Sequence, residues 1–306
     1  MLAAVVALAG CGGGGGAAAG AQRSSATSSA GSTTSPPAGT TTGTAAGGRP
    51  TKLLVVVLEN HAPESVEREM PWLSAQGKQY GNATQYYALA HPSLPNYLAM
   101  AGGTTFGITD DHGPDAHQLA GASVFGQGAP GVARTYAEGM AEPCQQHNDG
   151  RYAVRHNPWT YFPDERSACQ RDDVPAGTPS GGALQSDVAA GRMPTFGLLI
   201  PDVCNDAHDC DLSTADQWLA TWGQAIEAGA DWKAGRLAVL VTFDEDDHSA
   251  GNHITAVLMH PSLHGVRVDQ RLDHLDLSAS ASRLLGGQPL RDAAGRAGLL
   301  AAFGLA

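Results

Sequence analysis

Three apolar runs rich in β-branched residues each end in acidic side chains, and this pattern constrains the fold more than any other feature of the sequence. The runs and the acids that follow them are 52–58 before Glu59, 195–200 before Asp202, and 237–243 before Asp244 and Glu245. Unbroken apolar runs of this length are typical of strands that are buried on both faces of a parallel sheet. We therefore predict an α/β fold in which a central, mostly parallel sheet is flanked by helices within a single domain.

The acids at the strand ends predict a metal site. Parallel strands bring their carboxyl ends to one edge of the sheet, where α/β proteins place functional groups. Carboxylates crowded at that edge repel one another, and a divalent cation with oxygen and imidazole ligands would neutralise them. Each acid taken singly is well explained as a solvated loop residue. The threefold repetition favours one or more divalent cations as cofactor, with identity and number left open.

Ser93 is a candidate nucleophile at the start of a predicted helix. The segment 90–103 reads A-H-P-S-L-P-N-Y-L-A-M-A-G-G, in which Pro95 suits a first helical turn and Leu98 and Ala101 continue an apolar face. Backbone N–H groups at a helix start favour a bound phosphate, and a nearby cation would ionise the hydroxyl. The alternative is that Ser93 serves only as the N-cap of this helix.

These segments resemble motifs of the alkaline phosphatase-like superfamily. The Ser-x-Pro-Asn stretch is similar to the segment that carries the Ser or Thr nucleophile there. The Glu-Asn-His triplet after the first strand and two later stretches resemble the phosphoesterase branch, which contains bacterial acid phosphatases and phospholipases C. The motifs occur in the expected order at 59–61, 93–96, 155–159, 201–210 and 243–245. In size and motif order the chain is similar to the secreted acid phosphatases of mycobacteria, from Lys52 to Gly286.

The resemblance implies a phosphatase with an alkaline phosphatase-like fold, and it implies roles for individual residues. Ser93 would be phosphorylated during turnover and would also bind metal. Glu59 and Asn60 would bind metal or the substrate phosphate, and Asp244 with Glu245 would complete the metal shell. The usual Asp-His pair of the superfamily is Asp244-Glu245 in this chain. Such carboxylate-rich ligation favours a harder ion than zinc.

Five further residues receive roles from the same resemblance. Asn96 would donate a hydrogen bond to a phosphoryl oxygen, and His156 would lie near the phosphate. Asp202 and Asp206 stand where two-metal relatives keep further ligands. His208 would either join them as a ligand or protonate the leaving group.

The positions of two further segments that contain histidine are predicted from their place in the chain. His253 follows the late carboxylates closely enough to face the same site, as a metal ligand or as an acid. Asp110, Asp111 and His112 are expected to lie on a solvated loop.

The sequence thus predicts an exported, metal-dependent acid phosphatase that hydrolyses phosphomonoesters through a phosphoserine intermediate, with phosphoinositides or other lipid phosphates as candidate substrates. One alternative is a phosphodiesterase of the phospholipase C type, which the same chemistry would serve. An alternative of another class is a surface lipoprotein that binds metal or phosphate without turnover. The expected partner is a phosphorylated small-molecule or lipid substrate, and the chain is expected to be a monomer.

The charge balance argues against nucleic acid as the main partner. The chain has 18 Lys and Arg against 30 Asp and Glu. Residues 1–50 contribute only Arg23 and Arg49, so residues 51–306 carry 16 basic against 30 acidic side chains, a net charge of −14. Phosphate backbones are normally bound by basic side chains. No apolar run approaches the ~20 residues that span a bilayer, so membrane contact is expected only through an N-terminal lipid anchor.

The first 50 residues are predicted to be an export signal and a tether. Residues 1–11 form a short apolar stretch that ends in Leu-Ala-Gly-Cys, which resembles a lipoprotein signal with Cys11 as the lipid acceptor. An ordinary apolar N-terminus with a stray cysteine is the alternative. Residues 12–50 consist mostly of Gly, Ala, Ser, Thr and Pro and are predicted to be a disordered stalk before the phosphoesterase domain at 51–306.

The other four cysteines fit an extracytoplasmic domain with two disulfides. They are Cys144, Cys169, Cys204 and Cys210. Three pairings are available, and Cys144–Cys169 with Cys204–Cys210 is preferred because it closes the smaller loops. Zinc ligation is the alternative, but neither pair has C-x-x-C spacing.

Two helices are predicted in the second half of the chain. Residues 213–228 form an amphipathic pattern, with Ser213 and Asp216 as N-terminal caps. Residues 274–285 are predicted to form a helix that packs on the sheet.

Overall fold

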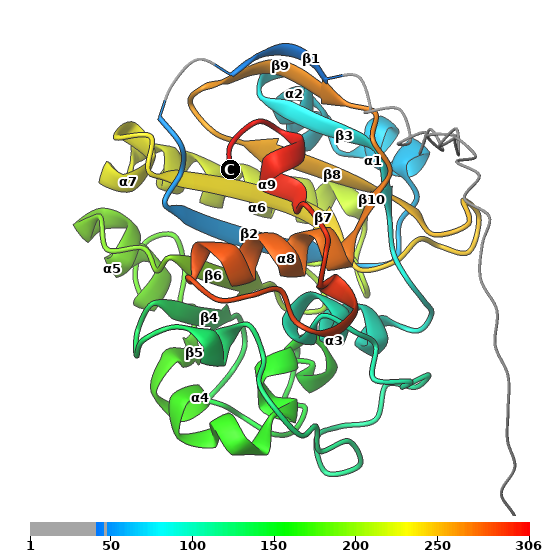
Figure 1. Ribbon diagram of the computed structural model, residues 1–306, viewed down its shortest axis with the longest axis vertical. Coiled ribbons are helices and arrows are strands. Elements are labelled where there is room, and N and C mark those ends of the chain that lie inside the picture. The colour runs from blue at the N-terminus through cyan, green and yellow to red at the C-terminus, as the bar shows by residue number, and fades with distance from the viewer. Residues whose placement is uncertain (1–40, 46–47) are drawn as a thin grey trace, which may run out of the picture. The chain divides into compact units, whose positions relative to one another are not determined.

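A ten-stranded sheet forms the centre of the fold, in the strand order β1-β9-β3-β8-β7-β2-β6-β4-β5 with β10 paired to β3 (Figure 1). The computed structural model describes residues 41–45 and 48–306. The predicted signal with Cys11 and the predicted stalk up to residue 40 lie outside the described residues, so both stay predictions.

The three apolar runs of the sequence lie side by side in the middle of this sheet. The strands are β1 (Thr41–Ala45), β2 (Lys52–Leu58), β3 (Gly81–Tyr87), β4 (Ala133–Ala137), β5 (Asp173–Pro175), β6 (Phe196–Ile200), β7 (Leu237–Phe243), β8 (His253–Met259), β9 (Leu263–Val268) and β10 (Leu272–Asp273). β2 is parallel to both of its neighbours, β6 and β7, and β4 and β5 continue the parallel arrangement. β8 runs antiparallel to β7 and β3. The prediction of a mostly parallel central sheet is confirmed.

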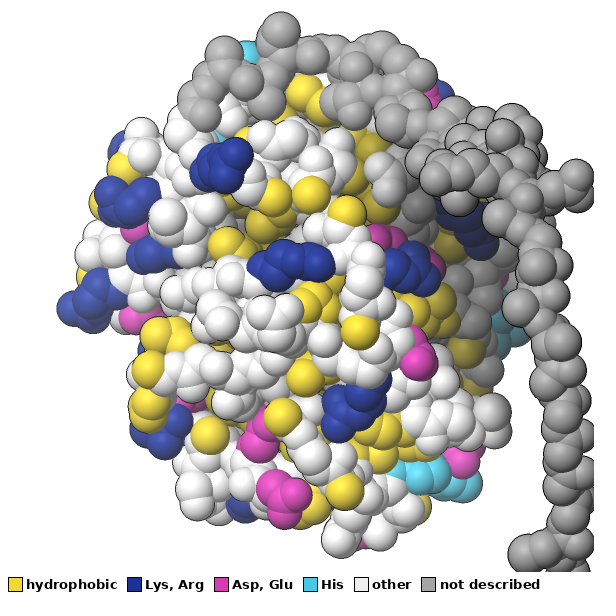
Figure 2. All heavy atoms as spheres, in the orientation of Figure 1, with side chains coloured by type: hydrophobic (Ala, Val, Ile, Leu, Met, Phe, Trp, Pro, Cys, Tyr) yellow, Lys and Arg dark blue, Asp and Glu magenta, His cyan; other side chains and the backbone are white. Residues whose placement is uncertain are grey.

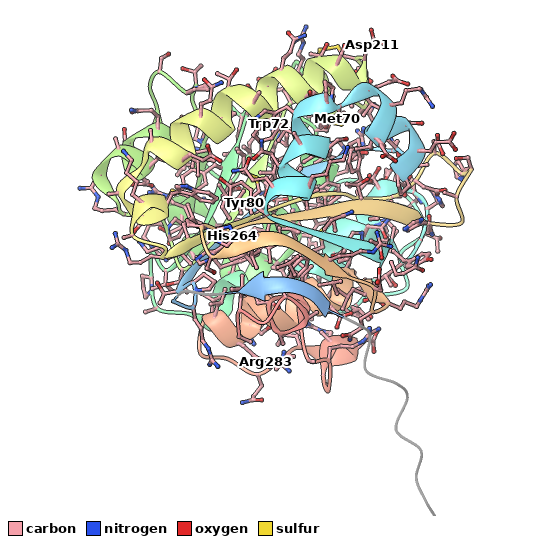
Figure 3. All side chains as sticks on the ribbon, turned by 90° about the horizontal axis from the view of Figure 1, so that it is seen from above. Met70, Trp72, Tyr80, Asp211, His264 and Arg283 are labelled. Atoms are coloured by element: carbon pink, nitrogen blue, oxygen red, sulfur yellow. A yellow bond between two sulfur atoms is a disulfide. The ribbon has the colours of Figure 1, made fainter. Side chains whose placement is uncertain are left out.

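Helices cover both faces of the sheet. They are α1 (Pro63–Glu69), α2 (Pro71–Gln79), α3 (Ser93–Gly102), α4 (Arg166–Asp172), α5 (Ala183–Ala190), α6 (Leu212–Ala228), α7 (Ala230–Lys233), α8 (His274–Leu284) and α9 (Leu299–Ala302). α3 packs on α8, and α2 packs on α6. Figure 3 shows the sheet between these two layers, with Met70 and Trp72 on one side and Arg283 of α8 on the other. Basic side chains on the face in Figure 2 stand apart, separated by polar and apolar ones.

The central strands are buried because both of their faces carry apolar side chains. Every residue of β7 is buried, as are residues 53–58 of β2. Val55 lines a small cavity with Tyr97 and Leu277 on one face, and Val56 lines another with Trp222 on the opposite face. Burial of each such aliphatic side chain contributes roughly 1.5–3 kcal/mol. The strands that lead into the acidic residues are therefore the best-anchored part of the fold.

Two disulfides are present with the predicted pairing: one ties the loop after β4 to α4, and the other closes the loop after β6. Cys144 and Cys169 are bonded with their Cα atoms 5.3 Å apart, and Cys204 and Cys210 with theirs 4.7 Å apart. Zinc ligation by these four sulfurs is thereby excluded. Among the described residues there is no helix with both the length and the apolar character needed to cross a bilayer.

Part of the predicted stalk forms a strand. Residues 41–45 pair antiparallel with β9 as β1, at the edge of the sheet. Threonine is a good strand former, and the outer edge of β9 would otherwise present unpaired N–H and C=O groups. These five residues of the predicted stalk thus pair with the sheet.

The predicted role of Asp216 as a cap of its own helix was wrong. α6 begins at Leu212 with Asp211 as its N-cap, and no side chain makes the capping hydrogen bond. The buried Asp216 carboxylate instead accepts hydrogen bonds from the backbone N–H groups of Trp72 and Leu73, both at 2.9 Å. It therefore caps α2, whose own N-terminus starts with a proline and has no side-chain cap.

We expect Asp216→Ala to lower the free energy of unfolding by about 2–4 kcal/mol, because it leaves two backbone N–H groups beside the core without acceptors. Asp211→Ala is the matched control, since this exposed residue (Figure 3) makes no capping bond, and it should cost less than about 0.5 kcal/mol. Urea denaturation of both variants measures the difference. Equal losses would show that Asp216 does not stabilise the α2–α6 contact.

Candidate active site

The carboxyl ends of β2, β6 and β7 meet at one edge of the sheet, and a buried group of acidic side chains lies there. Glu59 follows β2, Asp244 follows β7, and Asp206 lies in the loop after β6; none of the three is measurably exposed. Backbone hydrogen bonds hold these positions together. The Glu59 N–H donates to the Asp206 carbonyl and the Asp244 N–H to the Leu58 carbonyl, both at 2.9 Å. The sheet itself therefore brings the carboxylates together.

Ser93 is the first residue of α3, and its hydroxyl points into this group. Pro92 is the N-cap, and the Ser93 side chain makes no capping hydrogen bond. The hydroxyl instead donates to Glu59 Oε2 at 2.9 Å. The Leu94 N–H, which an N-cap side chain would have satisfied, donates to Asp111 Oδ1 at 2.9 Å. Of the two sequence interpretations of Ser93, the plain helix cap is thus excluded.

Glu59 is the centre of the hydrogen-bond network. Its Oε1 accepts from the Tyr97 hydroxyl at 2.7 Å, and its Oε2 accepts from Asn60 Nδ2 at 3.2 Å as well as from Ser93. Asn60 has a left-handed backbone with φ 55°, a conformation that Asn tolerates better than most residues. This turn directs the Asn60 N–H to Asp244 Oδ1 at 3.1 Å. Glu59 and Asn60 therefore tie the ends of β2 and β7 to α3.

His156 lies between two carboxylates. Its Nε2 is 3.1 Å from Glu59 Oε1, its Nδ1 is 3.2 Å from Asp206 Oδ2, and its ring stacks on Tyr97. Neither ring nitrogen of His156 has a well-aligned hydrogen bond, and Asp206 Oδ2 has none either. A neutral imidazole carries a single N–H, so at least one of the two contacts places a nitrogen lone pair against a carboxylate oxygen. One ligand atom from each of Glu59, His156 and Asp206 lies within 4.8 Å of the others.

Glu245 extends the group toward the surface. Its backbone N–H donates to Asp244 Oδ1 at 2.7 Å. His91 Nδ1 lies 3.0 Å from Glu245 Oε1, and His91 Nε2 lies 3.0 Å from Asp246 Oδ1. The imidazole of His91 also stacks on His248 with ring centroids 3.9 Å apart. His91 thereby joins the start of α3 to the loop after β7, a contact that the sequence did not predict.

Asn96 has a different task from the one predicted. Its Nδ2 donates to the Ala90 carbonyl at 2.8 Å and to Glu245 Oε2 at 3.2 Å, and its Oδ1 accepts from the N–H groups of Leu89 and Ala90. The side chain is fully buried. With both amide hydrogens engaged, Asn96 fixes the loop before Ser93 and orients Glu245, and it does not offer a free donor to a phosphoryl oxygen.

Asp202 and His253 do not join the group. Asp202 Oδ1 accepts from the N–H groups of Cys204 and Asn205, both at 2.9 Å, so it holds the turn after β6. His253 starts β8 at the same edge of the sheet, but its Nε2 contacts the Thr84 carbonyl at 2.9 Å on the β3 side. This contact ties His253 to β3, so its closeness to Asp244 in the sequence does not bring it into the group.

His208 and Arg155 lie at the accessible side of the group. His208 Nε2 is 3.0 Å from Arg155 Nη2, and its Nδ1 is 2.6 Å from Asp209 Oδ1. About one third of the His208 side chain is exposed. The backbone N–H of His208 donates to Asp206 Oδ1 at 2.7 Å, which joins this surface pair to the buried carboxylates.

Sequence reasoning missed Tyr97 and Asp111. Tyr97 follows Ser93 by four residues on the predicted helix, and the (i, i+4) spacing that places both on one face was the available signal. Asp111 lies on an exposed loop, as expected, and it also caps α3, and its charge contributes to raising the pKa of Glu245. No local pattern identifies this contact, because it joins the loop to the start of α3, 17 residues earlier in the chain.

Burial and mutual repulsion raise the pKa of each carboxyl in the group. Burial, then the charges of Asp244 and Asp206, raise the pKa of Glu59 well above its ordinary value. Burial raises the pKa of Asp206 to about 7, and burial with the Asp244 charge raises the pKa of Glu245 to about 9. Burial lowers the pKa of His156 to about 3. Without a cation the group therefore holds protons that ordinary carboxylates would have released at neutral pH.

Known proteins with similar sequences are phosphoesterases and phosphatases. The model of the Phosphoesterase family matches residues 64–258. A phosphatidylinositol-3-phosphatase of Mycobacterium tuberculosis is 27% identical over 243 residues, which cover 76% of each chain. An acid phosphatase of Aspergillus fumigatus is 27% identical over 244 residues, which cover 74% of this chain and 53% of that enzyme. The chain thus spans about half the length of the fungal acid phosphatases it matches.

Solved structures share the fold at low sequence identity. A protein of the alkaline phosphatase superfamily from Vibrio parahaemolyticus has a TM-score of 0.54 and 14% identity, over 83% of this chain and 72% of that one. The lipoteichoic acid synthase LtaP from Listeria monocytogenes has a TM-score of 0.54 and 12% identity, over 79% and 75%. These likenesses confirm the predicted alkaline phosphatase-like fold. Since the family match also spans most of the domain, the chain belongs to the Phosphoesterase family.

Proposed function

We propose that the protein is a metal-dependent acid phosphatase that hydrolyses phosphomonoesters through a phosphoserine intermediate at Ser93. The observation that carries the proposal is the Ser93 hydroxyl, which is free of helix capping and donates to Glu59 inside a buried group of carboxylates. Membership of the Phosphoesterase family makes the chain a phosphoric ester hydrolase, and several of its relatives are named acid phosphatases.

The side chains of the site fit a divalent cation. Both nitrogens of His156, Asp206 Oδ2 and Asp244 Oδ2 are buried without a hydrogen-bond partner. The described part of the protein places no hydrogen-bond donor on these atoms, and a cation bound among them would satisfy their lone pairs. The side chains that would hold the cation are Glu59, His156, Asp206 and Asp244. Three carboxylates with one imidazole suit an ion such as Mn²⁺ or Mg²⁺ better than zinc. When bound, the cation would lower the pKa of the Ser93 hydroxyl and neutralise charge on the phosphoryl oxygens.

The residues of the site position the nucleophile for in-line attack. Ser93 Oγ forms a bond to phosphorus while the bond from phosphorus to the ester oxygen breaks. Glu59 Oε2 accepts the Ser93 hydrogen bond and is placed to take its proton, and the Tyr97 hydroxyl fixes the other oxygen of Glu59. The positive end of the α3 dipole favours the phosphoryl group at this point. Water then cleaves the phosphoserine to release phosphate.

His208 and Arg155 would act on the accessible side of the phosphate. Arg155 offers a guanidinium to the phosphoryl oxygens. His208 Nε2 accepts a hydrogen bond from Arg155 Nη2, and about one third of the His208 side chain is exposed. Once Arg155 turns to the phosphate, this nitrogen would be free to carry the proton that the departing alcohol takes. We therefore propose His208 as the acid and not as a metal ligand.

We also propose where and on what the enzyme acts. The two disulfides support an oxidising, extracytoplasmic location, with Cys11 as the proposed lipid anchor. Phosphoinositides are candidate substrates because a relative is named a phosphatidylinositol-3-phosphatase. A phosphodiesterase of the phospholipase C type remains the rival activity, and a mono- and a diester of the same aryl alcohol separate the two.

Ser93→Ala should lower kcat for an aryl phosphomonoester by at least about 10³-fold, because no other hydroxyl replaces the nucleophile. Acid quenching with labelled substrate should leave phosphate on the wild-type chain and none on the variant. Ser278→Ala is the control, since Ser278 is equally buried but lies in α8 and its hydroxyl has no hydrogen-bond partner. Unchanged phosphate release by Ser93→Ala would refute the nucleophile.

In chelator, the free energy of unfolding should fall as pH rises from about 6.5 to 9. The raised pKa values of Glu245 (about 9) and Glu59 keep the folded state protonated while the unfolded carboxyls are ionised, so the folded state binds more protons. The lowered pKa of His156 opposes this trend near pH 6.5, where an unfolded histidine is still partly protonated, and has no effect above about pH 7.5, where histidine is neutral in both states. Denaturant titrations at several pH values measure the slope.

Glu245→Gln should flatten that slope and stabilise the metal-free protein at pH 8.5 by about 1–2 kcal/mol, since it removes one of the protons bound only in the folded state. Glu142→Gln, on the exposed loop before Cys144, is the matched control and should change nothing. Mn²⁺ should restore stability most strongly at high pH. A stability that rises with pH in chelator would contradict the assignment.

His208→Asn should lower kcat about 10²-fold for an alkyl phosphate and only a few-fold for p-nitrophenyl phosphate, whose leaving group needs no proton. His253→Asn is the control, because His253 contacts the Thr84 carbonyl and not the site. If His208 were a metal ligand, both substrates would be affected equally, and metal affinity would fall as well.

A further inference from the structure

A second group of metal-type ligands lies outside the active site, in the loop that follows α3. It consists of Asp110, His112 and His117. His117 Nε2 is 2.6 Å and His112 Nδ1 is 3.0 Å from the same oxygen, Asp110 Oδ1. The residues are partly exposed: 39% of the Asp110 side chain, 73% of His112 and 20% of His117. None of the three contacts the buried carboxylates described above.

The three side chains are already close to the spacing that one ion requires. One ligand atom from each lies within 4.8 Å of the others. Two ligand atoms that are each ~2.1 Å from a tetrahedral ion lie about 3.4 Å apart, so shifts of at most about 1.4 Å complete the site. His112 supplies this movement easily, because most of its side chain is in solvent.

Local backbone contacts hold the other two ligands in place. The backbone N–H of His112 donates to Asp110 Oδ1 at 2.9 Å. The Gly113 carbonyl accepts from the N–H groups of Ala116 and His117 at 3.0 and 3.3 Å, and this turn returns His117 to Asp110.

We propose that Asp110, His112 and His117 bind a Zn²⁺ ion at the rim of the active site. Two imidazoles and one carboxylate form a nitrogen-rich set that suits zinc, in contrast to the oxygen-rich set formed by Glu59 and its neighbours. Three protein ligands leave a coordination position open to water, as the exposure of the group requires. This zinc site does not depend on the proposed phosphatase mechanism.

The position of this site gives the ion an effect on the active site. Asp111 lies between two of the ligands in sequence, and its carboxylate caps α3 by accepting a hydrogen bond from the Leu94 N–H. A cavity of about 320 Å³ is lined by Asp111, His112 and Arg155. A cation on His112 would face this cavity and offset the negative charge of the loop, so that an anionic substrate meets less repulsion there.

The test is a calorimetric Zn²⁺ titration of the metal-stripped, full-length protein. His117→Ala and Asp110→Asn should each weaken one class of zinc binding by at least tenfold. His264→Ala is the matched control, since this exposed histidine lies on β9 (Figure 3) and removal should leave zinc binding unchanged. Equal thermal unfolding of the metal-free variants excludes misfolding as the cause.

Asp206→Asn separates this proposal from the proposed function. It disrupts the active-site group, so it should abolish hydrolysis while the zinc site of the loop is retained. ¹⁵N spectra of the imidazole rings should show His112 and His117 shifted by zinc in both wild type and Asp206→Asn, and no such shift of His112 in His117→Ala. Zinc binding by His117→Ala as tight as that by His264→Ala would overturn the proposal, whether or not the enzyme hydrolyses phosphomonoesters.

Discussion

Repulsion among buried carboxylates at one edge of the sheet is the constraint on which the site depends. Backbone hydrogen bonds from the Glu59 and Asp244 N–H groups tie these residues to neighbouring segments of the sheet edge, so the side chains cannot move apart without breaking strand pairing. The strands themselves are anchored by apolar burial on both faces. The burial of the strands therefore offsets the free-energy cost of the crowded carboxylates, and bound protons or a cation would lower this cost.

Neutral donors keep the geometry of this group independent of its charge. The hydroxyls of Ser93 and Tyr97 and the amide of Asn60 all donate to Glu59. Asn96 does the same for Glu245 and fixes the loop before α3. The Cys204–Cys210 disulfide closes the loop that carries Asp206, whose position relative to β2 is thereby restricted. A site built in this way keeps its ligands in place when they are protonated.

The sequence predicted the elements of the fold and the meeting of strand ends, but not the direction of individual side chains. Apolar runs identify β2, β6 and β7 because burial on both faces leaves a continuous signal. The contacts of Asn96, Asp202 and His253 depend on loops and on the reversed direction of β8, which no local pattern encodes. The position of Tyr97 could be predicted from its helical spacing from Ser93, whereas the contact of Asp111 joins a loop to the start of α3 and could not be predicted.

The raised pKa values also explain how a carboxylate-rich site relates to acidic conditions. A cation bound by Glu59 and Asp206 would have to displace the protons that these carboxyls hold, so its affinity would fall as pH falls through the range of their pKa values. Activity in acid then requires that cation binding has little further free-energy cost from moving the ligands. Tyr97 and Asn60 donate hydrogen bonds to the Glu59 oxygens in either protonation state. The free-energy cost of binding a cation would therefore come from proton release and not from movement of the ligands. Rigid burial creates the repulsion among the carboxylates. It would also keep the site able to bind a cation at low pH, where protons compete most strongly for the same oxygens.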